Sequence, residues 1–299
     1  MVTLVCPRCK SPLPQAAESL TCAGCGARYA LAGEVPVLVH EDLTEQEEHQ
    51  RRYFDDEFSG YSEYELENWR VSFIERIFES LAVLDGGGPY LDVGVGGSGA
   101  TVIEAARRGV EAAGCDLSVE GVLSARRFAR GEGVDGTASF VVCAADALPF
   151  PDAAFGSASA VAVLEHLDDD LPAIRELARV LRPGGLLWLT VPHAFRYMTP
   201  PAWPFYWLHD RRIGHKRHYD EKSLVQLGAA FGLEHVRTSY SAHTVKIAQY
   251  VGSRLFRRMR DPRSRLWWRL ERADRRAESR RYGAMHISVT LRRTEARTG

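Results

Sequence analysis

Short apolar runs alternate with amphipathic segments along most of the chain. Runs suited to buried strands begin at Tyr90, and helix-like segments or turns separate them as far as Pro192. Two further strands are expected at 233–241 and 284–293. Because strands that alternate with helices form parallel sheets covered on both faces, the pattern predicts an α/β fold with a doubly wound, Rossmann-like sheet of seven strands.

The first of these strands runs directly into a turn rich in glycine. The run YLDVGVGGSG, from Tyr90 to Gly99, has glycine at 94, 96, 97 and 99, and the helical pattern ATVIEAARRG follows it. Glycine lets the backbone approach a ligand closely, and free amides at a helix N-terminus bind polar or anionic groups. The segment is a candidate nucleotide-binding turn, although a purely structural turn has the same composition.

An acidic residue closes the second expected strand. Asp116 stands 24 positions after Asp92, and a carboxylate at this place can accept both hydroxyls of an adenosine ribose. Aspartate is also a favoured helix N-cap, and the helical pattern DLSVEGVLSARR begins here. Ribose binding and helix capping can coexist at one strand end.

Five spaced motifs follow one another from Tyr90 to Pro192: LDVGVGGSG, CDLS, AADALPFPDAAF, LEHL and RVLRPGGLLWLTVP. Together they resemble a class I S-adenosylmethionine (SAM)-dependent methyltransferase of the type 11-like group, whereas a dehydrogenase would lack the last three. One departure from the family is that Ser98 stands where a third glycine is expected, with Gly99 one position later.

The resemblance implies roles for individual residues. Gly94 and Gly96 would contact the methionine portion of SAM, and Asp116 would bind the ribose. Asp146 would bind the adenine amino group with the Ala147 amide nearby, although a simple turn residue is the alternative for Asp146. The full predicted donor-binding set is Asp92, Gly94, Gly96, Asp116, Leu117, Asp146, Ala147 and Leu164.

Four of the six cysteines form two CxxC pairs near the N-terminus. Twelve residues separate the pair Cys6 and Cys9 from the pair Cys22 and Cys25. Two such knuckles can hold one Zn²⁺ through four thiolates, and the zinc would be structural because no position is left for water or substrate. Disulfides or redox-active pairs are the alternative. The other two cysteines lie in apolar strands and are expected in the core.

The pattern divides the chain into three parts. Residues 1–42 are expected to form a zinc-ribbon module, which resembles small zinc-ribbon proteins that partner methyltransferases and would either present substrate or cap the domain. Residues 43–85 are expected to form a linker and lid helices, and residues 86–299 the methyltransferase domain.

Helical spacing within the middle part separates two groups of aromatic and apolar residues. One group is expected in the core rather than against the cofactor: Phe73, Ile77, Phe78 and Leu81. The other supplies candidates for a lid over the SAM pocket, although exposed tyrosines on a polar helix fit equally well: Tyr53, Tyr61 and Tyr64.

Methyl transfer to a hydroxyl or ammonium group requires in-line approach, exclusion of water and a base for one proton. Histidines at strand ends are the natural candidates, because ligands bind at that edge of a doubly wound sheet. Leu164 to His166 would lie beside the methyl group by resemblance, and a structural hydrogen bond is the alternative for His166. The predicted catalytic set is His166, His193, His218 and Tyr219.

Aromatic and proline residues are concentrated in 193–218, which is expected to be an active-site loop. Such a surface suggests an apolar or planar acceptor, although a lid that only packs on the domain has the same composition. The candidate walls are Trp203, Phe205, Tyr206 and Trp207.

Positive charge is concentrated in an Arg-rich helical insertion at 244–282, before the last strand. Residues 251–282 hold twelve arginines against four acidic residues, a net charge of +8 in a chain whose formal net charge is −1. Two amphipathic helices are expected. The first has an apolar stripe at Val251, Leu255, Phe256 and Met259, and the second has one at Leu266, Leu270, Ala273 and Ala277, with Trp267 and Trp268. Peripheral membrane contact, RNA contact and packing on the enzyme's own surface all fit this segment.

Length and composition agree with one α/β enzyme with additions. No apolar run reaches the ~18 residues needed to cross a bilayer, and the start MVTLVCPRCK lacks the features of a signal peptide, so a cytoplasmic protein is expected. The sequence therefore predicts a SAM-dependent methyltransferase that modifies oxygen or nitrogen of a small organic acceptor, hydrophobic or lipid-linked. An rRNA or tRNA base methyltransferase and a non-catalytic SAM-binding scaffold are the alternatives.

Overall fold

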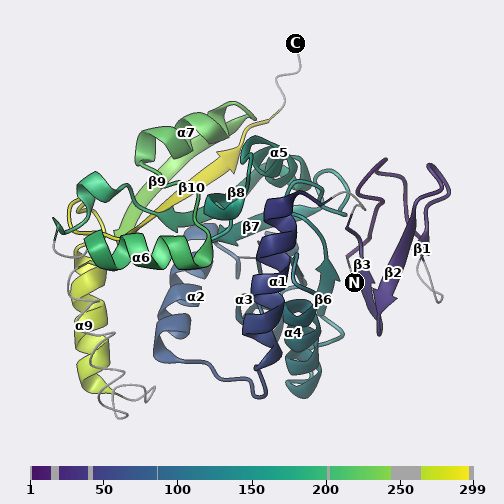
Figure 1. Ribbon diagram of the computed structural model, residues 1–299, viewed down its shortest axis with the longest axis horizontal. Helices are drawn as coiled ribbons and strands as arrows, with labels where there is room; N and C mark the ends of the chain where they lie inside the picture. Colours follow the sequence, from purple (N-terminus) through teal and green to yellow (C-terminus); the bar gives the residue numbers. More distant parts are fainter. Residues whose placement is uncertain are drawn as a thin grey trace.

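The computed structural model describes residues 2–14, 20–39, 43–85, 87–200, 203–243 and 264–295. Their strands form one sheet with helices on both faces (Figure 1). Within these ranges, no helix combines the length and the apolar character needed to cross a membrane.

The strands are β1 (Leu20–Thr21), β2 (Arg28–Ala32), β3 (Val35–Val37), β4 (Tyr90–Val93), β5 (Ala112–Asp116), β6 (Ala138–Val142), β7 (Phe155–Val161), β8 (Leu181–Pro192), β9 (Leu233–Ser241) and β10 (His286–Arg293). The helices are α1 (Glu45–Ser59), α2 (Asn68–Leu81), α3 (Ala100–Arg107), α4 (Val119–Gly131), α5 (Leu171–Val180), α6 (Trp203–Ile213), α7 (Glu221–Ala229) and α9 (Arg265–Arg276), with short 3-10 helices η1 (Leu164–His166) and η2 (Phe195–Tyr197).

The sheet has ten strands rather than the predicted seven, in the order β1-β2-β3-β6-β5-β4-β7-β8-β10-β9. The seven expected strands form its doubly wound part, in which β10 runs antiparallel between β8 and β9. The prediction of seven was wrong because β3 pairs in parallel with the edge strand β6, where Leu38 N donates to Val142 O at 2.8 Å. The N-terminal strands thereby extend the sheet (Figure 1).

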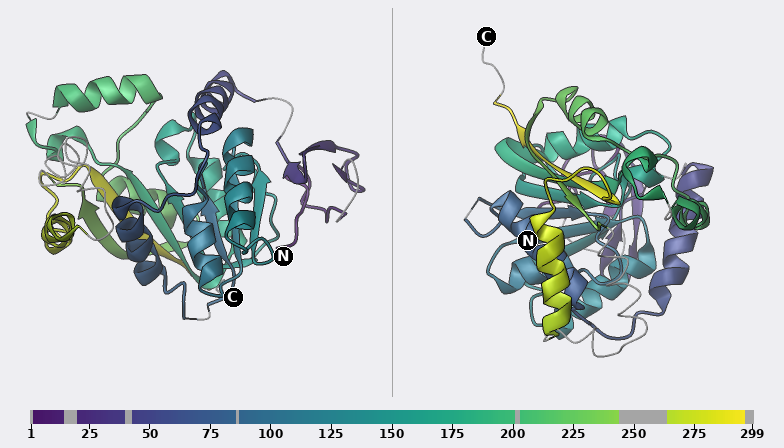
Figure 2. Two further views of the ribbon diagram at one scale, coloured as in Figure 1. Left: turned by 90° about the horizontal axis from the view of Figure 1, so that it is seen from below. Right: turned by 90° about the vertical axis from the view of Figure 1, so that its left-hand side faces the viewer.

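Two apolar clusters lie on opposite faces of the sheet. Helices α2, α3 and α4 pack into one cluster through residues such as Ile77, Ile103 and Val122. Helices α5 and α7 pack into the other through residues such as Ile174 and Leu224. The result is a three-layer domain whose parallel strands are buried on both faces, as their nearly continuous apolar sequences require (Figure 2). Cys115 and Cys143 are buried in the core.

Helix α9 belongs to the Arg-rich insertion and packs against α2 (Figure 1). The predicted stripe was correct for Trp267, which is buried, and wrong for Leu266 and Ala273, which are exposed. Glu271 and Asp274 complete the buried face. The reason is electrostatic, because Arg76 of α2 contacts both buried carboxylates, at 3.1 and 3.2 Å. For α9, packing on the protein's own surface therefore accounts for the polar face. The first predicted helix, with Val251, Leu255, Phe256 and Met259, lies outside the described residues.

Most of the predicted aromatic loop is helical, since it contains η2 and α6. Trp203 and Trp207 are about half exposed on α6, and neither lines the pocket described below. The side chains of Phe205 and His209 lie outside the described part of the structure.

Candidate functional site

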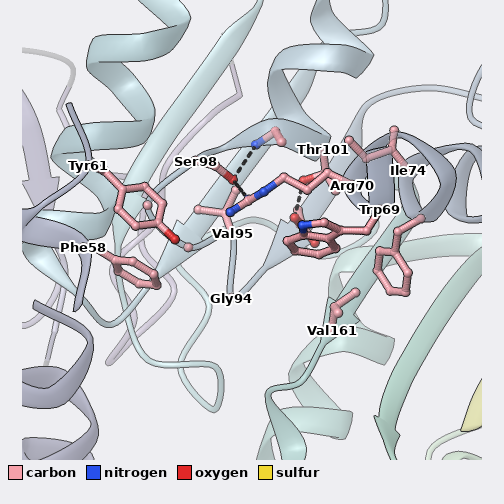
Figure 3. Close-up of a pocket in the computed structure, with 15 residues that line it drawn as sticks. Phe58, Tyr61, Trp69, Arg70, Ile74, Gly94, Val95, Ser98, Thr101 and Val161 are labelled. Atoms are coloured by element: carbon pink, nitrogen blue, oxygen red, sulfur yellow. Dashed lines mark hydrogen bonds between the residues drawn. The ribbon is translucent and has the colours of Figure 1, made fainter. Parts of the chain in front are cut away.

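A pocket opens where the glycine turn leaves β4, between the sheet edge and the segment joining α1 to α2 (Figure 3). The turn and the strand ends form its floor: Asp92, Gly94, Val95, Gly96, Gly97, Ser98, Ala100, Thr101 and Val161. Side chains from α1, α2 and the segment between them form its walls: Phe58, Tyr61, Trp69, Arg70, Phe73 and Ile74.

The Asp116 carboxylate holds the glycine turn in place. Its Oδ2 accepts a hydrogen bond from Gly96 N at 2.9 Å, and its Oδ1 accepts one from Ser118 N at 2.9 Å. Burial raises the pKa of Asp116, while the backbone N–H groups oppose that shift. Each carboxylate oxygen has a second lone pair, so Asp116 can accept ligand hydroxyls while keeping both backbone contacts. Ser118, rather than Asp116, caps α4 through a hydrogen bond from Gly121 N at 2.9 Å.

Gly94 begins the turn in a conformation that favours glycine. Its φ is +77°, and a Cβ at this position would lie 2.3 Å from Cγ2 of Val163. We expect Gly94→Ala to lower the free energy of unfolding by about 2–4 kcal/mol, from backbone strain and overpacking together.

Gly109→Ala is the matched control for Gly94→Ala. Gly109 also has a positive φ, +81°, but its Cβ would meet nothing within 4 Å. The control should lose only about 1–2 kcal/mol from backbone strain. Urea unfolding measures both values, and equal losses in the two variants would contradict the close approach at Gly94.

Asp92 lies beneath the turn and is buried. It accepts hydrogen bonds from the hydroxyls of Ser159 and Thr101. Burial nevertheless raises its pKa from 3.8 to about 6. The folded protein therefore keeps this proton at a pH where the unfolded chain has lost it.

This raised pKa predicts a pH-dependent stability. The contribution of protonated Asp92 is fully present below the unfolded pKa of 3.8 and is lost as pH rises through about 6. Relative to Asp92→Asn, the ligand-free protein should lose about 2–3 kcal/mol of unfolding free energy between pH 4 and pH 7. Urea titrations across that range measure the difference, and parallel pH profiles for the two proteins would contradict the raised pKa.

Ser98, the residue that departs from the family pattern, anchors a cation in the pocket. The Arg70 guanidinium donates a hydrogen bond to Ser98 Oγ (Figure 3), and Gly99 takes the left-handed conformation that begins α3, with φ +58°. Sequence reasoning did not identify Arg70 or its neighbour Trp69 as pocket residues. Phe73 was assigned to the core, yet it is only partly buried and lines the pocket.

Of the three candidate lid tyrosines, Tyr61 lines the pocket. Tyr64 instead points to α3 and α4, where its hydroxyl donates to Glu104 at 3.4 Å and its ring packs on Phe128. Tyr53 packs against Phe54. Phe58 covers the glycine turn, since Cβ atoms at Gly96 and Gly97 would lie within 3.5 Å of its ring.

The other predicted donor contacts lie at the same edge of the sheet. Leu117 directly follows β5, and Leu164 is buried in η1, which follows β7. Asp146 and Ala147 lie in the turn after β6, where Ala147 N donates to Ala144 O at 3.3 Å. These residues are not among those that line the pocket.

The four predicted catalytic residues separate into two groups. His193 is fully buried, stacked on Tyr197 with ring centroids 4.7 Å apart, and burial lowers its pKa to about 4. Tyr219 is also buried, and its hydroxyl donates to Asp170 at 2.7 Å. Neither residue is among those that line the pocket.

His166 and His218 belong to a polar group beyond the pocket. His166 lies in η1, and burial and the neighbouring His215 lower its pKa to about 3. His218 Nε2 lies 3.0 Å from Asp210 Oδ2 of α6. Burial would raise the pKa of Asp210, but hydrogen bonds from His215 and His218 outweigh it and keep that pKa well below its usual range.

The four N-terminal cysteines come together in a single cluster. The Sγ atoms of Cys6 and Cys25 are 3.7 Å apart, and those of Cys9 and Cys22 are 3.4 Å apart. All four sulfurs lie within 4.8 Å of one another. Hydrogen bonds from Ser11 lower the pKa of the Cys9 thiol to about 6, which favours a thiolate there.

A tetrahedral metal ion with bonds of about 2.3 Å to sulfur places its ligands about 3.8 Å apart. The observed sulfur separations of 3.4 and 3.7 Å are close to that spacing and much longer than a disulfide bond of about 2.05 Å. The cluster therefore has the donor set and the size of a four-thiolate metal site.

The doubly wound sheet places the glycine turn and the Asp116 carboxylate on adjacent strand ends, an arrangement typical of α/β domains that bind nucleotides. In agreement, residues 91–189 match the family model described as a methyltransferase domain.

The chain is similar to curated methyltransferases over part of its length. Norajmaline N-methyltransferase of Rauvolfia serpentina is 34% identical over 112 residues, 38% of each chain. The 27-O-demethylrifamycin SV methyltransferase of Amycolatopsis mediterranei is 34% identical over 135 residues, 45% of this chain and 47% of the relative. The matches thus span less than half the length of these relatives.

Among solved structures, the geranyl diphosphate C-methyltransferase from Streptomyces coelicolor A3(2) has a similar fold. It superposes with a TM-score of 0.59 at 16% identity, covering 84% of this chain and 99% of that one. At this identity the likeness concerns the fold alone.

Proposed function

We propose that this protein transfers a methyl group from SAM to an oxygen or nitrogen atom of a small organic acceptor. The observation that carries the proposal is that a glycine turn, which a ligand can approach closely, and the Asp116 carboxylate stand on adjacent strand ends and are joined by a hydrogen bond. A nucleoside with a charged amino-acid tail fits that combination. Methyltransferases that act on small molecules among the relatives support the acceptor class.

The proposed donor contacts follow the layout of the strand ends. Gly94 and Gly96 would contact the methionine portion, and Asp116 would accept the ribose hydroxyls. Asp146 and Ala147 would contact the adenine. Arg70 lines the pocket and contacts Ser98, and its guanidinium would pair with the carboxylate of the donor.

The sulfonium of SAM is already a good leaving group, so the protein mainly aligns the acceptor and excludes water. The acceptor's oxygen–methyl or nitrogen–methyl bond forms as the sulfur–methyl bond breaks, and the sulfur keeps the electron pair. His218 is the proposed proton acceptor, because Asp210 contacts its Nε2 at 3.0 Å and would stabilise the imidazolium.

We also propose that Cys6, Cys9, Cys22 and Cys25 bind one structural Zn²⁺. The support is the sulfur spacing together with the short length of the N-terminal module, because a segment of this size cannot build a large core of its own. Residues outside the cluster join this module to the domain, since Lys10 forms an ion pair with Glu176 at 2.7 Å.

The catalytic proposal is tested by incubating the purified protein with methyl-labelled SAM and a panel of hydroxyl and amine acceptors. We expect label in at least one organic product, together with formation of S-adenosylhomocysteine (SAH). Donor binding without transfer to any acceptor class would instead support the scaffold alternative.

A further inference from the structure

Glu165, His166 and His215 form a compact cluster next to the donor pocket. One ligand atom from each side chain lies within 4.8 Å of the others. Glu165 is fully buried and His166 is 9% exposed, while the His215 side chain is 8% exposed. Two imidazoles and a carboxylate are therefore concentrated in a nearly dry site.

The backbone fixes the three side chains against one another. Lys216 N donates to Glu165 O at 2.8 Å, which attaches the segment after α6 to η1 and brings His215 to Glu165. Gln46 of α1 donates to His166 O at 3.1 Å. The rings of His166 and His215 have centroids 4.8 Å apart. The cluster is thus assembled by α1, η1 and the end of α6.

Several polar atoms of the cluster lack the partners that burial demands. Neither carboxylate oxygen of Glu165 has a hydrogen-bond partner among the described residues, and the same holds for Nδ1 of His166. No Lys or Arg of the described ranges forms an ion pair with Glu165, and His215 Nε2 lies 3.9 Å from its Oε1. Burying a carboxyl group without a hydrogen-bond partner is energetically costly, so the arrangement points to a missing ligand.

Asp210 orients His215 toward Glu165. Its Oδ1 lies 2.8 Å from His215 Nδ1, so that nitrogen carries the proton shared with the carboxylate. The lone pair of Nε2 is then directed to the side of Glu165. A carboxylate on the far nitrogen of an imidazole is the arrangement that supports metal-ligating histidines.

We propose that Glu165, His166 and His215 bind one divalent transition-metal ion of the zinc class. Imidazole nitrogens with one carboxylate suit zinc, iron, cobalt and nickel, whereas magnesium and calcium prefer oxygen alone. The carboxylate supplies charge to the cation, and the cation supplies the partner that the buried oxygens lack.

Three protein ligands leave at least one coordination position, in contrast to the closed cysteine cluster. His166 contacts the ring of Phe54 with centroids 5.5 Å apart, and Phe54 stacks at 5.6 Å on Phe58, which lines the donor pocket. These ring contacts connect the cluster to the side of the molecule where methyl transfer is proposed, and an acceptor oxygen or water would complete the coordination. Only this last step rests on the proposed function.

Cobalt titration of the full chain distinguishes the two metal sites. Metal-stripped protein is titrated with Co²⁺ and monitored by absorbance, since thiolate ligands give charge-transfer bands that nitrogen and oxygen ligands do not. We expect two equivalents per chain, one with thiolate bands and one without. If the wild-type protein binds only cobalt with thiolate bands, the proposal is overturned, whatever its methyltransferase activity.

Variants assign the second equivalent to these residues. Glu165→Gln and His215→Gln should each lose the equivalent without thiolate bands and keep the other. His49→Gln, at an exposed histidine of α1, is the matched control and should keep both. If the folded Glu165 and His215 variants bind as much cobalt as the control, Glu165 is a neutral buried acid and the site is wrongly assigned.

Discussion

Replacing Asp116 with alanine is expected to weaken binding of SAM and SAH about 100-fold, equivalent to about 2.7 kcal/mol. The variant loses a charge-assisted acceptor for the ribose hydroxyls, an interaction worth about 1.5–3 kcal/mol. It also removes the acceptor for Gly96 N and Ser118 N, which fixes the turn under the donor. Calorimetric titration with SAH measures the change in affinity.

Two further variants separate donor binding from general effects. Asp116→Asn keeps an oxygen acceptor but loses the charge, so its affinity should lie between those of wild type and Asp116→Ala. Asp135→Ala, at an exposed aspartate, should bind SAH like wild type. An Asp116→Ala protein that binds SAH as tightly as the Asp135→Ala control would exclude Asp116 as the ribose ligand.

Replacing Cys22 with serine is expected to remove one equivalent of zinc per chain and to unfold the N-terminal module. Substituting a residue that supports a metal ligand lowers metal affinity about 10–100-fold. Loss of a ligand itself should therefore lower the zinc affinity more than about 100-fold. Since metal binding and folding are coupled in small modules, hydrogen exchange at β1 and β2 should become fast. Metal analysis and hydrogen exchange check the two effects.

Cys143→Ser is the matched control, because Cys143 is buried in the core away from the cluster. This variant should keep its zinc even if its stability falls. An unchanged zinc content in folded Cys22→Ser would disprove the structural zinc site.

The central fold could be predicted because its signals are local. The strands expected at 233–241 and 284–293 are β9 (Leu233–Ser241) and β10 (His286–Arg293), with nearly the expected bounds. The glycine turn and Asp116 stand at neighbouring strand ends because a doubly wound sheet brings consecutive parallel strands together.

Features that depend on contacts between distant segments were not predictable. Nothing in the composition of β3 indicates that it pairs with β6, about a hundred positions away, and so the sheet was expected to be smaller. Arg70 enters the pocket from α2, outside every recognised motif.

The buried face of α9 shows how charge can override an apolar pattern. Hydrophobic spacing favoured Leu266 and Ala273, yet Glu271 and Asp274 are buried because Arg76 of α2 receives them. A helix rich in arginine has many ways to satisfy its charges, and the sequence does not identify the partner helix. Likewise, the sequence does not indicate that His215, which follows α6, lies beside Glu165.

Calorimetric titration of the purified wild-type protein with SAH tests the central claim most directly. The structure predicts one SAH per chain, bound at the glycine turn and Asp116 and displaced by SAM. A protein that is folded by circular dichroism but gives no binding heat with SAH at several temperatures, and no competition from SAM in equilibrium dialysis, would contradict it.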